Sequence, residues 1–565
     1  MLFALALLGA SAIAAQAPSS IEPPITATHG AGAVASSQAD ATEVGLEILA
    51  RGGNAIDAAI AVHFALAVTY PAAGHIGGGG FLLYRDAAGQ AWFLDFRETA
   101  PAAATSALYL DAEGQPIAAA SRVGWKAVGV PGAVPGMWEA HRRWGLLPWK
   151  ELIEPARRLA SAGFRVDARE VDRLRRYGSA LREDPLAAAV FFPQSEVVEV
   201  DSLLRQPKLA ATLERIREEG EMPMREGAIV ADMIAASDAA GGILSAADFR
   251  DYRPTMREVW TFPWQGRTIL AAPLPSSGGI FLQQVLHTLK GTPFTVWGYD
   301  DPRSVLFLGE ATSAAFRDRN RWLGDPMGLD FDPRDLVDEE YLQRRRRSLG
   351  MKTYTPPDRA LPGPPVEHLE TTHFSVVDGD GAAVSCTTTL NGAYGAKVMA
   401  PGGFLMNNEM DDFAALPGTA NQFGLVQGNY NGVVAGHRPL SSMCPVIVVE
   451  DGKVDAVVGS PGGPTILTSV LQVMLARYAY GMSPQAAVAA PRFHRQDRPP
   501  EVQYERLRLD LALRDALREV GQPMKIRNGI GDVNAIFRTD RGWEAVADPR
   551  WGGAAGKVSS EPRPR

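Results

Sequence analysis

The segment His368–Asn391, HLETTHFSVVDGDGAAVSCTTTLN, constrains the fold more than any other part of the chain. Two runs rich in β-branched residues flank the sequence DGDG, whose glycines can adopt the positive φ angles of a tight turn. The pattern predicts an antiparallel β-hairpin. If the turn is centred on Asp380, Thr371 lies opposite Thr389, and directly opposite Cβ atoms are only about 5 Å apart.

The predicted hairpin has one polar and one apolar face, because successive side chains of a strand point to opposite sides. The polar face contains Thr371, His373, Ser375, Ser385, Thr387 and Thr389, and the apolar face contains Phe374, Val376, Val384, Cys386 and Leu390. Two threonine hydroxyls therefore meet at the open end. Threonine also favours strands for purely structural reasons, so sheet propensity is the alternative explanation.

A threonine hydroxyl becomes a useful nucleophile only when a base can take its proton. The α-amine of the threonine itself can be that base if the chain is cut immediately before it, since a free α-amine has a pKa of about 7.7 to 8.0. The proline-rich stretch Pro356–Glu370 precedes Thr371 and reads as an exposed linker in which a cut could be accommodated. Thr371 is thus a candidate N-terminal nucleophile.

The remaining pattern indicates a mixed helix and strand protein. Helical spacing extends from Ala33 to about Val68, and Asn54 caps a nearly all-apolar, buried second helix. The glycines Gly77–Gly80 are followed by a strand rather than by the helix that a phosphate-binding loop requires, so they indicate a close backbone crossing. We expect mostly helix between 130 and 250, and another helix from about Thr465.

Composition excludes several classes of function. The net charge is −8, which argues against nucleic-acid binding, and the run Arg344–Arg347 beside acidic residues reads as a solvated helix face. The nine histidines are scattered and no metal-ligand spacing occurs, so no metal and no cofactor is expected. Cys386 and Cys444 read as small buried hydrophobes, with a disulfide left open.

The first seventeen residues resemble a signal peptide, with an apolar run followed by small residues, although a basic start is missing. No later segment is long and apolar enough to form a stable membrane span. We therefore expect an exported protein, periplasmic or secreted, and keep a cytosolic chain with an apolar start as the alternative.

Seven short strings occur in order along the chain: GGNAIDAAIA, GHIGGGGF, LDFRETAP, TTHFSVVD, NNEMDDF, RPLSSMCP and GSPGG. Together they closely resemble the γ-glutamyltransferases (γ-glutamyl transpeptidases), a family of N-terminal nucleophile hydrolases. The resemblance implies an α/β (α+β) fold, namely a four-layer αββα sandwich built from two autoprocessed subunits. It also implies a cut between Glu370 and Thr371 that gives a heterodimer of a large subunit, 18–370, and a small subunit, 371–565.

The same resemblance assigns the catalytic roles. Thr371 would be the nucleophile of both self-cleavage and turnover, and Thr389 would support its hydroxyl. Gly462 and Gly463 would form the oxyanion hole with their backbone N–H groups. The implied donors are glutathione and other γ-glutamyl compounds, and the implied acceptors are water, amino acids or dipeptides.

Substrate recognition is also implied by position. Arg97, Ser441 and Ser442 match the family's ligands for the glutamyl α-carboxylate, and an arginine fork suits a carboxylate. The α-ammonium would be held by Asn391, Glu409 and Asp412.

Each of these residues also has a structural alternative. Arg97 could form a strand-end ion pair with Asp95 or Glu98, and the other strings could be ordinary loops and turns. One position departs from the family. Phe423 aligns with a lid tyrosine of several bacterial members, and a phenylalanine cannot hydrogen-bond Asn391, so lid closure is in question.

Two other functions are open at this stage. A cephalosporin (glutaryl) acylase of the same superfamily would share the fold, the cut and the nucleophile, but its acyl group lacks the α-amine that Glu409 and Asp412 would bind. A secreted binding protein that keeps the fold and is never cut is the non-enzymatic alternative.

Overall fold

The computed structural model describes residues 26–28, 32–349, 371–506 and 511–558. The predicted signal peptide, the linker Pro356–Glu370 and the residue before the expected cut, Glu370, lie outside the described residues.

Two seven-stranded antiparallel sheets form the centre of the molecule. The first has the order β19 (Ala554–Val558), β2 (Gly32–Ser36), β10 (Thr371–Val377), β11 (Ala383–Thr389), β3 (Gly79–Arg85), β4 (Ala91–Asp95), β7 (Thr255–Arg257). The second has the order β1 (Thr26–Thr28), β18 (Gly542–Val546), β17 (Asn534–Thr539), β13 (Lys453–Gly459), β12 (Val446–Glu450), β9 (Arg267–Ala271), β8 (Trp260–Trp264).

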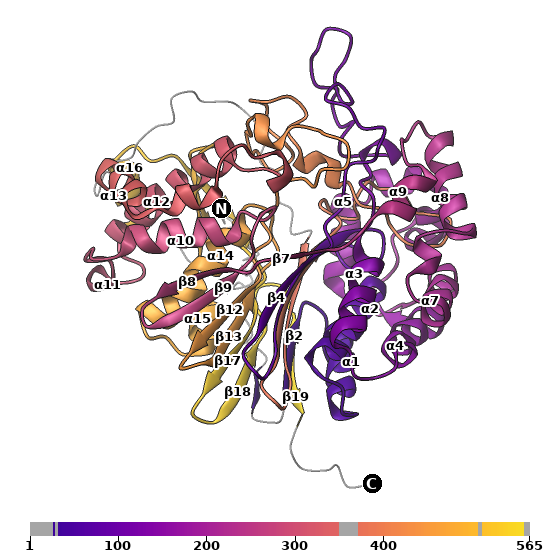
Figure 1. Ribbon diagram of the computed structural model, residues 1–565, viewed down its shortest axis with the longest axis horizontal. Coiled ribbons are helices and arrows are strands. Elements are labelled where there is room, and N and C mark those ends of the chain that lie inside the picture. Colours follow the sequence, from indigo (N-terminus) through magenta and orange to yellow (C-terminus); the bar gives the residue numbers. More distant parts are fainter. Residues whose placement is uncertain (1–25, 29–31, 350–370, 507–510, 559–565) are drawn as a thin grey trace, which may run out of the picture.

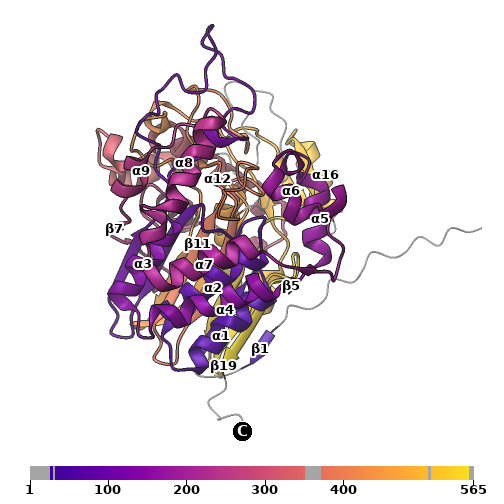
Figure 2. The same cartoon turned by 90° about the vertical axis from the view of Figure 1, so that its right-hand side faces the viewer.

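Helices cover the outer face of each sheet, so the layers are helix, sheet, sheet and helix, as predicted (Figure 1). The first sheet is covered by α1 (Ala39–Ala50), α2 (Ala55–Thr69), α3 (Ala133–Trp144), α4 (Trp149–Ala162) and α7 (Pro207–Glu219), which Figure 2 shows from outside. The second is covered by α10 (Gly278–Leu289), α12 (Pro302–Trp322) and α14 (Thr465–Met474).

The other elements lie around this frame. The helices are α5 (Ala168–Tyr177), α6 (Pro185–Phe191), α8 (Ala228–Ala239), α9 (Ala246–Asp251), α11 (Phe294–Trp297), α13 (Glu339–Ser348), α15 (Pro484–Ala489) and α16 (Leu511–Glu519). The short strands are β5 (Phe164–Arg165), β6 (Leu203–Leu204), β14 (Phe493–His494), β15 (Val502–Glu505) and β16 (Met524–Arg527). The predicted helical region between 130 and 250 is confirmed.

The predicted hairpin is confirmed with its register: β10 pairs with β11, Thr371 lies opposite Thr389, and Ser375 lies opposite Ser385. The apolar face packs on the helices of the first half. The polar face is buried between the two sheets, where Ser375 Oγ donates to the carbonyl of Asn534 at 2.9 Å. His373 lies on the same polar face, and burial lowers the pKa of its imidazole to about 3. The side chains of this face therefore carry no charge.

The helix expected from Ala33 was wrong at its start. Residues Gly32–Ser36 form strand β2, and the helix begins only at Ala39. The segment GAVAS is small and wholly buried because it lies between β10 and β19. Pairing with neighbours on both sides overrides the helical spacing that the sequence shows.

The buried second helix is confirmed. Asn54 and Asp57 form a reciprocal capping box at the start of α2, and every residue of this helix is buried. The glycine crossing is confirmed as well. A Cβ on Gly78 would lie 2.3 Å from the carbonyl oxygen of Thr389, and one on Gly80 would lie 2.5 Å from that of Thr387. Only glycine lets these two strands approach each other here.

Cys386 and Cys444 are both free and buried, so the disulfide left open by the sequence does not form in this structure. The arginine run lies on α13, as expected, and Arg344 is solvated beside Glu340. Arg345 differs, since its guanidinium pairs with Asp318 of α12. Among the residues described, none of the helices has both the length and the apolar character needed to cross a membrane.

Candidate functional site

The two threonine hydroxyls predicted to meet do so at the open end of the hairpin. Thr371 begins β10 and Thr389 ends β11, and their Oγ1 atoms lie 3.2 Å apart in a buried position. The backbone N–H of Asn391 donates to Thr389 Oγ1 at 2.8 Å. Asn391 has a φ of +73°, so the chain turns sharply after β11 and brings its amide back to the hydroxyl.

Arg97 lies two residues after β4, and its guanidinium is fully buried. Nη1 lies 2.6 Å from Glu409 Oε1, Nη2 lies 2.5 Å from Asp412 Oδ2, and Nε donates to the carbonyl of Pro439 at 2.9 Å. The strand-end alternative for Arg97 is therefore wrong. The Asp95 carboxylate pairs instead with Arg257 at 2.7 Å.

The ionisable side chains around Arg97 shift one another's pKa values. Burial raises the pKa of Glu409 well above its ordinary value, although Arg97 opposes the shift. Burial likewise raises the pKa of the neighbouring Glu98 to about 8. For Arg97 burial opposes the charge, but Glu409 and Asp412 more than offset it, so its pKa lies above the ordinary value. The guanidinium is the cation that lets two carboxylates lie side by side.

Ser441 and Ser442 face the same space from the segment that precedes β12. The carbonyl of Ser441 accepts hydrogen bonds from the N–H and the hydroxyl of Ser277, both at 2.9 Å. The Ser442 hydroxyl is buried and has no partner among the described residues. An unpaired buried hydroxyl in a pocket that the Arg97 guanidinium also lines is suited to a carboxylate ligand.

Gly462 and Gly463 form a turn between β13 and α14, with φ values of +128° and +56° that favour glycine. Within the described part of the chain, neither backbone N–H donates a hydrogen bond. Phe423 covers this turn, because a Cβ on Gly463 would lie 2.9 Å from its ring. Two unpaired N–H groups beside a buried hydroxyl can hold an oxyanion.

One pocket unites these parts. It is lined by Thr371, Thr389, Asn391, Arg97, Glu409, Asp412, Ser441, Ser442 and Gly463, together with Phe423, Arg319, Leu425, Met443, Pro464 and Ile466. The structure thus brings together every described residue predicted for the site except Gly462, which adjoins Gly463 without lining the pocket. The pocket is small, with a volume of about 20 Å³.

Sequence reasoning missed Arg319. This arginine of α12 is buried in the pocket wall, where its Nε donates to Ser277 Oγ at 3.2 Å and its Nη1 to Gln427 Oε1 at 3.1 Å. Gln427 in turn donates to the carbonyl of Asp412 at 2.9 Å. Burial lowers the pKa of Arg319 to about 10. Nothing in the sequence separates it from Arg317 and Arg321 on the same helix.

Comparison with known proteins agrees with this geometry. The family profile described as Gamma-glutamyltranspeptidase matches residues 41–558. The chain is 41% identical to the glutathione hydrolase proenzyme of Pseudomonas aeruginosa, over 93% of this chain and 94% of that protein. It is 38% identical to the glutathione hydrolase proenzyme of Escherichia coli, over 92% of this chain and 90% of that protein.

A solved structure also matches nearly the whole fold. The cephalosporin acylase from Bacillus halodurans has a TM-score of 0.83 and 26% sequence identity, over 98% of this chain and all of that chain. The family profile and the relatives, taken with the pocket, show that this chain belongs to the γ-glutamyltranspeptidase family.

Proposed function

We propose that the protein is an autoprocessed γ-glutamyltransferase and glutathione hydrolase, cut between Glu370 and Thr371, in which Thr371 is the nucleophile. The observation that carries this proposal is the 3.2 Å contact between the Thr371 and Thr389 hydroxyls inside the pocket. Cleavage would free the α-amine of Thr371, which is the base that this hydroxyl lacks.

Acylation follows from this arrangement. Thr371 Oγ1 attacks the γ-carbonyl carbon of the donor and its proton passes to the α-amine. The N–H groups of Gly462 and Gly463 bind the resulting oxyanion, a kind of contact whose removal typically costs on the order of 10² to 10³ in rate. Collapse breaks the C–N bond, the α-amine returns the proton to the leaving amine, and a γ-glutamyl ester on Thr371 remains.

Deacylation repeats these steps with a second nucleophile. Water or the amine of an amino acid or dipeptide attacks the ester, and its proton passes through the α-amine to the threonine oxygen. The products are glutamate or a new γ-glutamyl amide, and the kinetics are ping-pong.

Recognition of the glutamyl group rests on the charged wall of the pocket. Arg97, Ser441 and Ser442 would bind the α-carboxylate, while Asn391, Glu409 and Asp412 would bind the α-ammonium. The α-carboxylate of the donor then becomes a further partner of Arg97. Its α-ammonium becomes a further partner of Glu409 and Asp412. We also propose export of the chain, through the signal-like segment 1–17.

A second candidate function is a cephalosporin acylase, which the Bacillus halodurans structure favours. An acyl group without an α-amine would leave Glu409 and Asp412 with no new cation to bind. The buried acids therefore support the γ-glutamyl donor over a glutaryl one.

The experiment compares γ-glutamyl-p-nitroanilide with glutaryl-p-nitroanilide, which differ only in the α-amine. We expect kcat/KM to favour the γ-glutamyl compound by about tenfold to a hundredfold, since a charge-assisted contact typically contributes about 1.5 to 3 kcal/mol. A preference for the glutaryl compound would overturn the proposed function in favour of the acylase.

A further inference from the structure

Ser460 lies at the start of the turn that carries Gly462 and Gly463. Its hydroxyl donates to the carbonyl of Pro461 at 2.8 Å. The peptide group between Pro461 and Gly462 is trans. It is also planar, so its carbonyl and its N–H point in opposite directions. The hydrogen bond that fixes the Pro461 carbonyl therefore also fixes the direction of the Gly462 N–H.

The Ser460 hydroxyl is itself held by the segment that precedes β17. It accepts the backbone N–H of Asp532 at 3.0 Å, and the Ser460 side chain is fully buried. Gly531 leaves room for this contact, because a Cβ there would lie 2.8 Å from Ser460 Oγ. Ser460 thus connects the loop 530–533 to the turn of Gly462.

Asp532 contacts the start of β10 through its side chain. Its Oδ2 accepts from Ser37 Oγ at 2.8 Å, and Ser37 Oγ accepts from Thr372 Oγ1 at 3.3 Å. Asn534 Nδ2 also donates to Ser37 Oγ, at 3.1 Å. The residue that directly follows Thr371 is therefore connected to the same loop as the oxyanion turn.

This connection would join the two subunits after the proposed cut. Ser37 would lie on the large subunit, whereas Thr372 and Asp532 would lie on the small one. Thr371 would then be a chain terminus, and termini are poorly ordered unless other contacts hold them. The contact between Thr372 and Ser37 supplies such a hold one residue from the proposed nucleophile.

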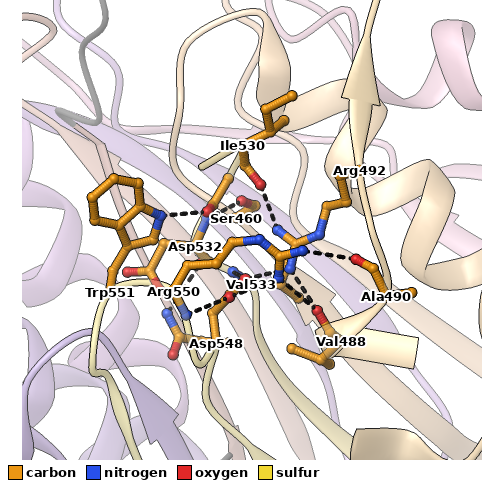
Figure 3. Close-up of polar contacts among 12 residues, drawn as sticks. Ser460, Val488, Ala490, Arg492, Ile530, Asp532, Val533, Asp548, Arg550 and Trp551 are labelled. Carbon is orange, nitrogen blue, oxygen red and sulfur yellow. Dashed lines mark hydrogen bonds and ion pairs between the residues drawn. The ribbon is translucent and has the colours of Figure 1, made fainter. Parts of the chain in front are cut away.

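The loop 530–533 is supported by a buried ion pair (Figure 3). Arg492 pairs with Asp548, and neither side chain is exposed. Arg492 Nη1 also donates to the carbonyl of Ile530 at 2.7 Å, and Asp548 Oδ2 accepts the N–H of Val533 at 2.9 Å. The loop backbone is therefore held at both ends.

The side chain of Asp532 is unfavourable for folding. Its Oδ1 is buried and has no hydrogen-bond partner among the described residues. Burial raises the pKa of its carboxyl to about 7, and the charge of Asp548 adds to the shift. A buried carboxylate with an unpaired oxygen lowers stability, so its place between two segments of the site favours a role in function.

We propose that Ser460 and Asp532 are positioning residues of the active site. Ser460 directs the Gly462 N–H toward the oxyanion, and Asp532 holds the start of β10 through Ser37. The attacking oxygen and the oxyanion donor then keep a fixed separation through acylation and deacylation. The inference rests on the proposed function, because it takes Thr371 as the nucleophile and Gly462 as an oxyanion donor.

The alternative is that these contacts only stabilise the junction of the two sheets. Their loss would then lower the Tm and leave the rate of each cleaved molecule unchanged. A positioning role instead lowers kcat, and it does so without weakening the binding of the glutamyl group, because neither Ser460 nor Asp532 lines the catalytic pocket.

The first test is Ser460→Ala with γ-glutamyl-p-nitroanilide, with rates expressed per cleaved chain from intact-mass analysis. We expect kcat to fall about tenfold, which corresponds to the loss of one well-placed hydrogen bond. Acylation and deacylation use the same oxyanion donor and slow together, so KM should stay within about twofold of wild type.

Two inhibitors separate positioning from stability. A glutamate analogue with a boronic acid in place of the γ-carboxyl group forms a tetrahedral adduct with a hydroxyl nucleophile, which places an oxygen at the oxyanion donors. Glutamate itself binds without a covalent bond. In Ser460→Ala we expect the Ki of the boronic acid to rise about tenfold, and the Ki of glutamate to stay within about twofold of wild type.

A second pair of variants tests the other connection. Asp532→Ala should lower kcat roughly fivefold, because Ser37 loses its acceptor, whereas Asp532→Asn keeps an acceptor oxygen and should stay within about twofold of wild type. Asp455→Asn is the matched control. Asp455 is also a buried carboxylate, and it accepts from Tyr478 Oη at 2.6 Å, but it does not line the catalytic pocket. This variant should keep the wild-type kcat whatever its Tm.

Wild-type kcat per cleaved chain in both Ser460→Ala and Asp532→Ala would overturn the inference. An equal rise of the two Ki values in Ser460→Ala would overturn it as well. A wild-type protein that is never cut, or that is cut and cleaves no γ-glutamyl donor, would instead overturn the proposed function, so the two failures are distinguishable.

Discussion

The hydroxyl oxygen of Thr389 lies 3.2 Å from that of Thr371 and accepts the backbone N–H of Asn391 at 2.8 Å. Because the Asn391 N–H occupies an acceptor position on Thr389, the Thr389 hydroxyl can donate its proton to Thr371. In the proposed mechanism, the Thr371 hydroxyl then keeps its own proton for transfer to the α-amine that cleavage would expose. This relationship explains why the second threonine stands at the end of the partner strand.

We expect Thr389→Val to lower kcat about tenfold, because it removes one hydrogen bond to Thr371, the proposed nucleophile, and leaves the Asn391 N–H unpaired. Valine has nearly the shape of threonine and favours strands, so the hairpin should persist. Steady-state kinetics with γ-glutamyl-p-nitroanilide measure the effect. Thr389→Ser keeps the hydroxyl and should stay within a few-fold of wild type; an equal loss in both variants would contradict the hydrogen-bond role.

Thr371→Ala should abolish both self-cleavage and turnover, because one hydroxyl serves both reactions in the proposed mechanism. Intact-mass analysis of the purified protein, with N-terminal sequencing of the smaller fragment, checks this. Wild type should give a fragment that begins TTHFSVVD, and the variant should remain a single chain. Efficient cleavage of the variant would rule out Thr371 as the nucleophile of processing.

Arg97→Lys should raise the KM for glutathione by about tenfold or more, because an ammonium cannot replace the fork that contacts Glu409, Asp412 and Pro439 at once. The retained charge keeps the two buried acids from facing each other without a cation. Arg257→Lys is the control, since Arg257 also pairs with a buried carboxylate, that of Asp95, but does not line the pocket. An unchanged KM in Arg97→Lys would remove this residue from substrate recognition.

The sequence predicted the hairpin correctly because its information is local. The turn glycines and the alternation of Thr371, His373 and Ser375 determine both register and face. Local patterns could not predict which distant segments come together in the site. The strings that carry Arg97, Asp412 and Gly463 could be placed in one site only through the family resemblance, since no local pattern tells which loops converge.

Other features could not be predicted because they depend on tertiary neighbours. The strand character of Gly32–Ser36 comes from pairing with β10 and β19, not from its own residues. Arg319 looks like any other charge on α12 until the fold shows that it faces the pocket. The pairing of Arg97 with Glu409 and Asp412, residues far away in the chain, likewise follows from burial, which leaves each charge with few available partners.

Glu98 predicts a pH dependence of stability that is separate from catalysis. Its side chain is fully buried, neither carboxylate oxygen has a hydrogen-bond partner among the described residues, and burial raises its pKa from 4.5 to about 8. Between these two values the folded protein retains a proton that the unfolded chain releases, so the free energy of unfolding falls as the pH rises through this window. We expect the Tm of wild type to decrease from pH 5 to pH 8.5, with this contribution lost above the folded pKa.

Glu98→Gln keeps the shape without the titrating proton, so its Tm should vary less over the same range, while the exposed control Glu196→Gln should follow wild type. Thermal denaturation at four pH values decides the matter, and parallel curves for wild type and Glu98→Gln would show that Glu98 is not the group that titrates.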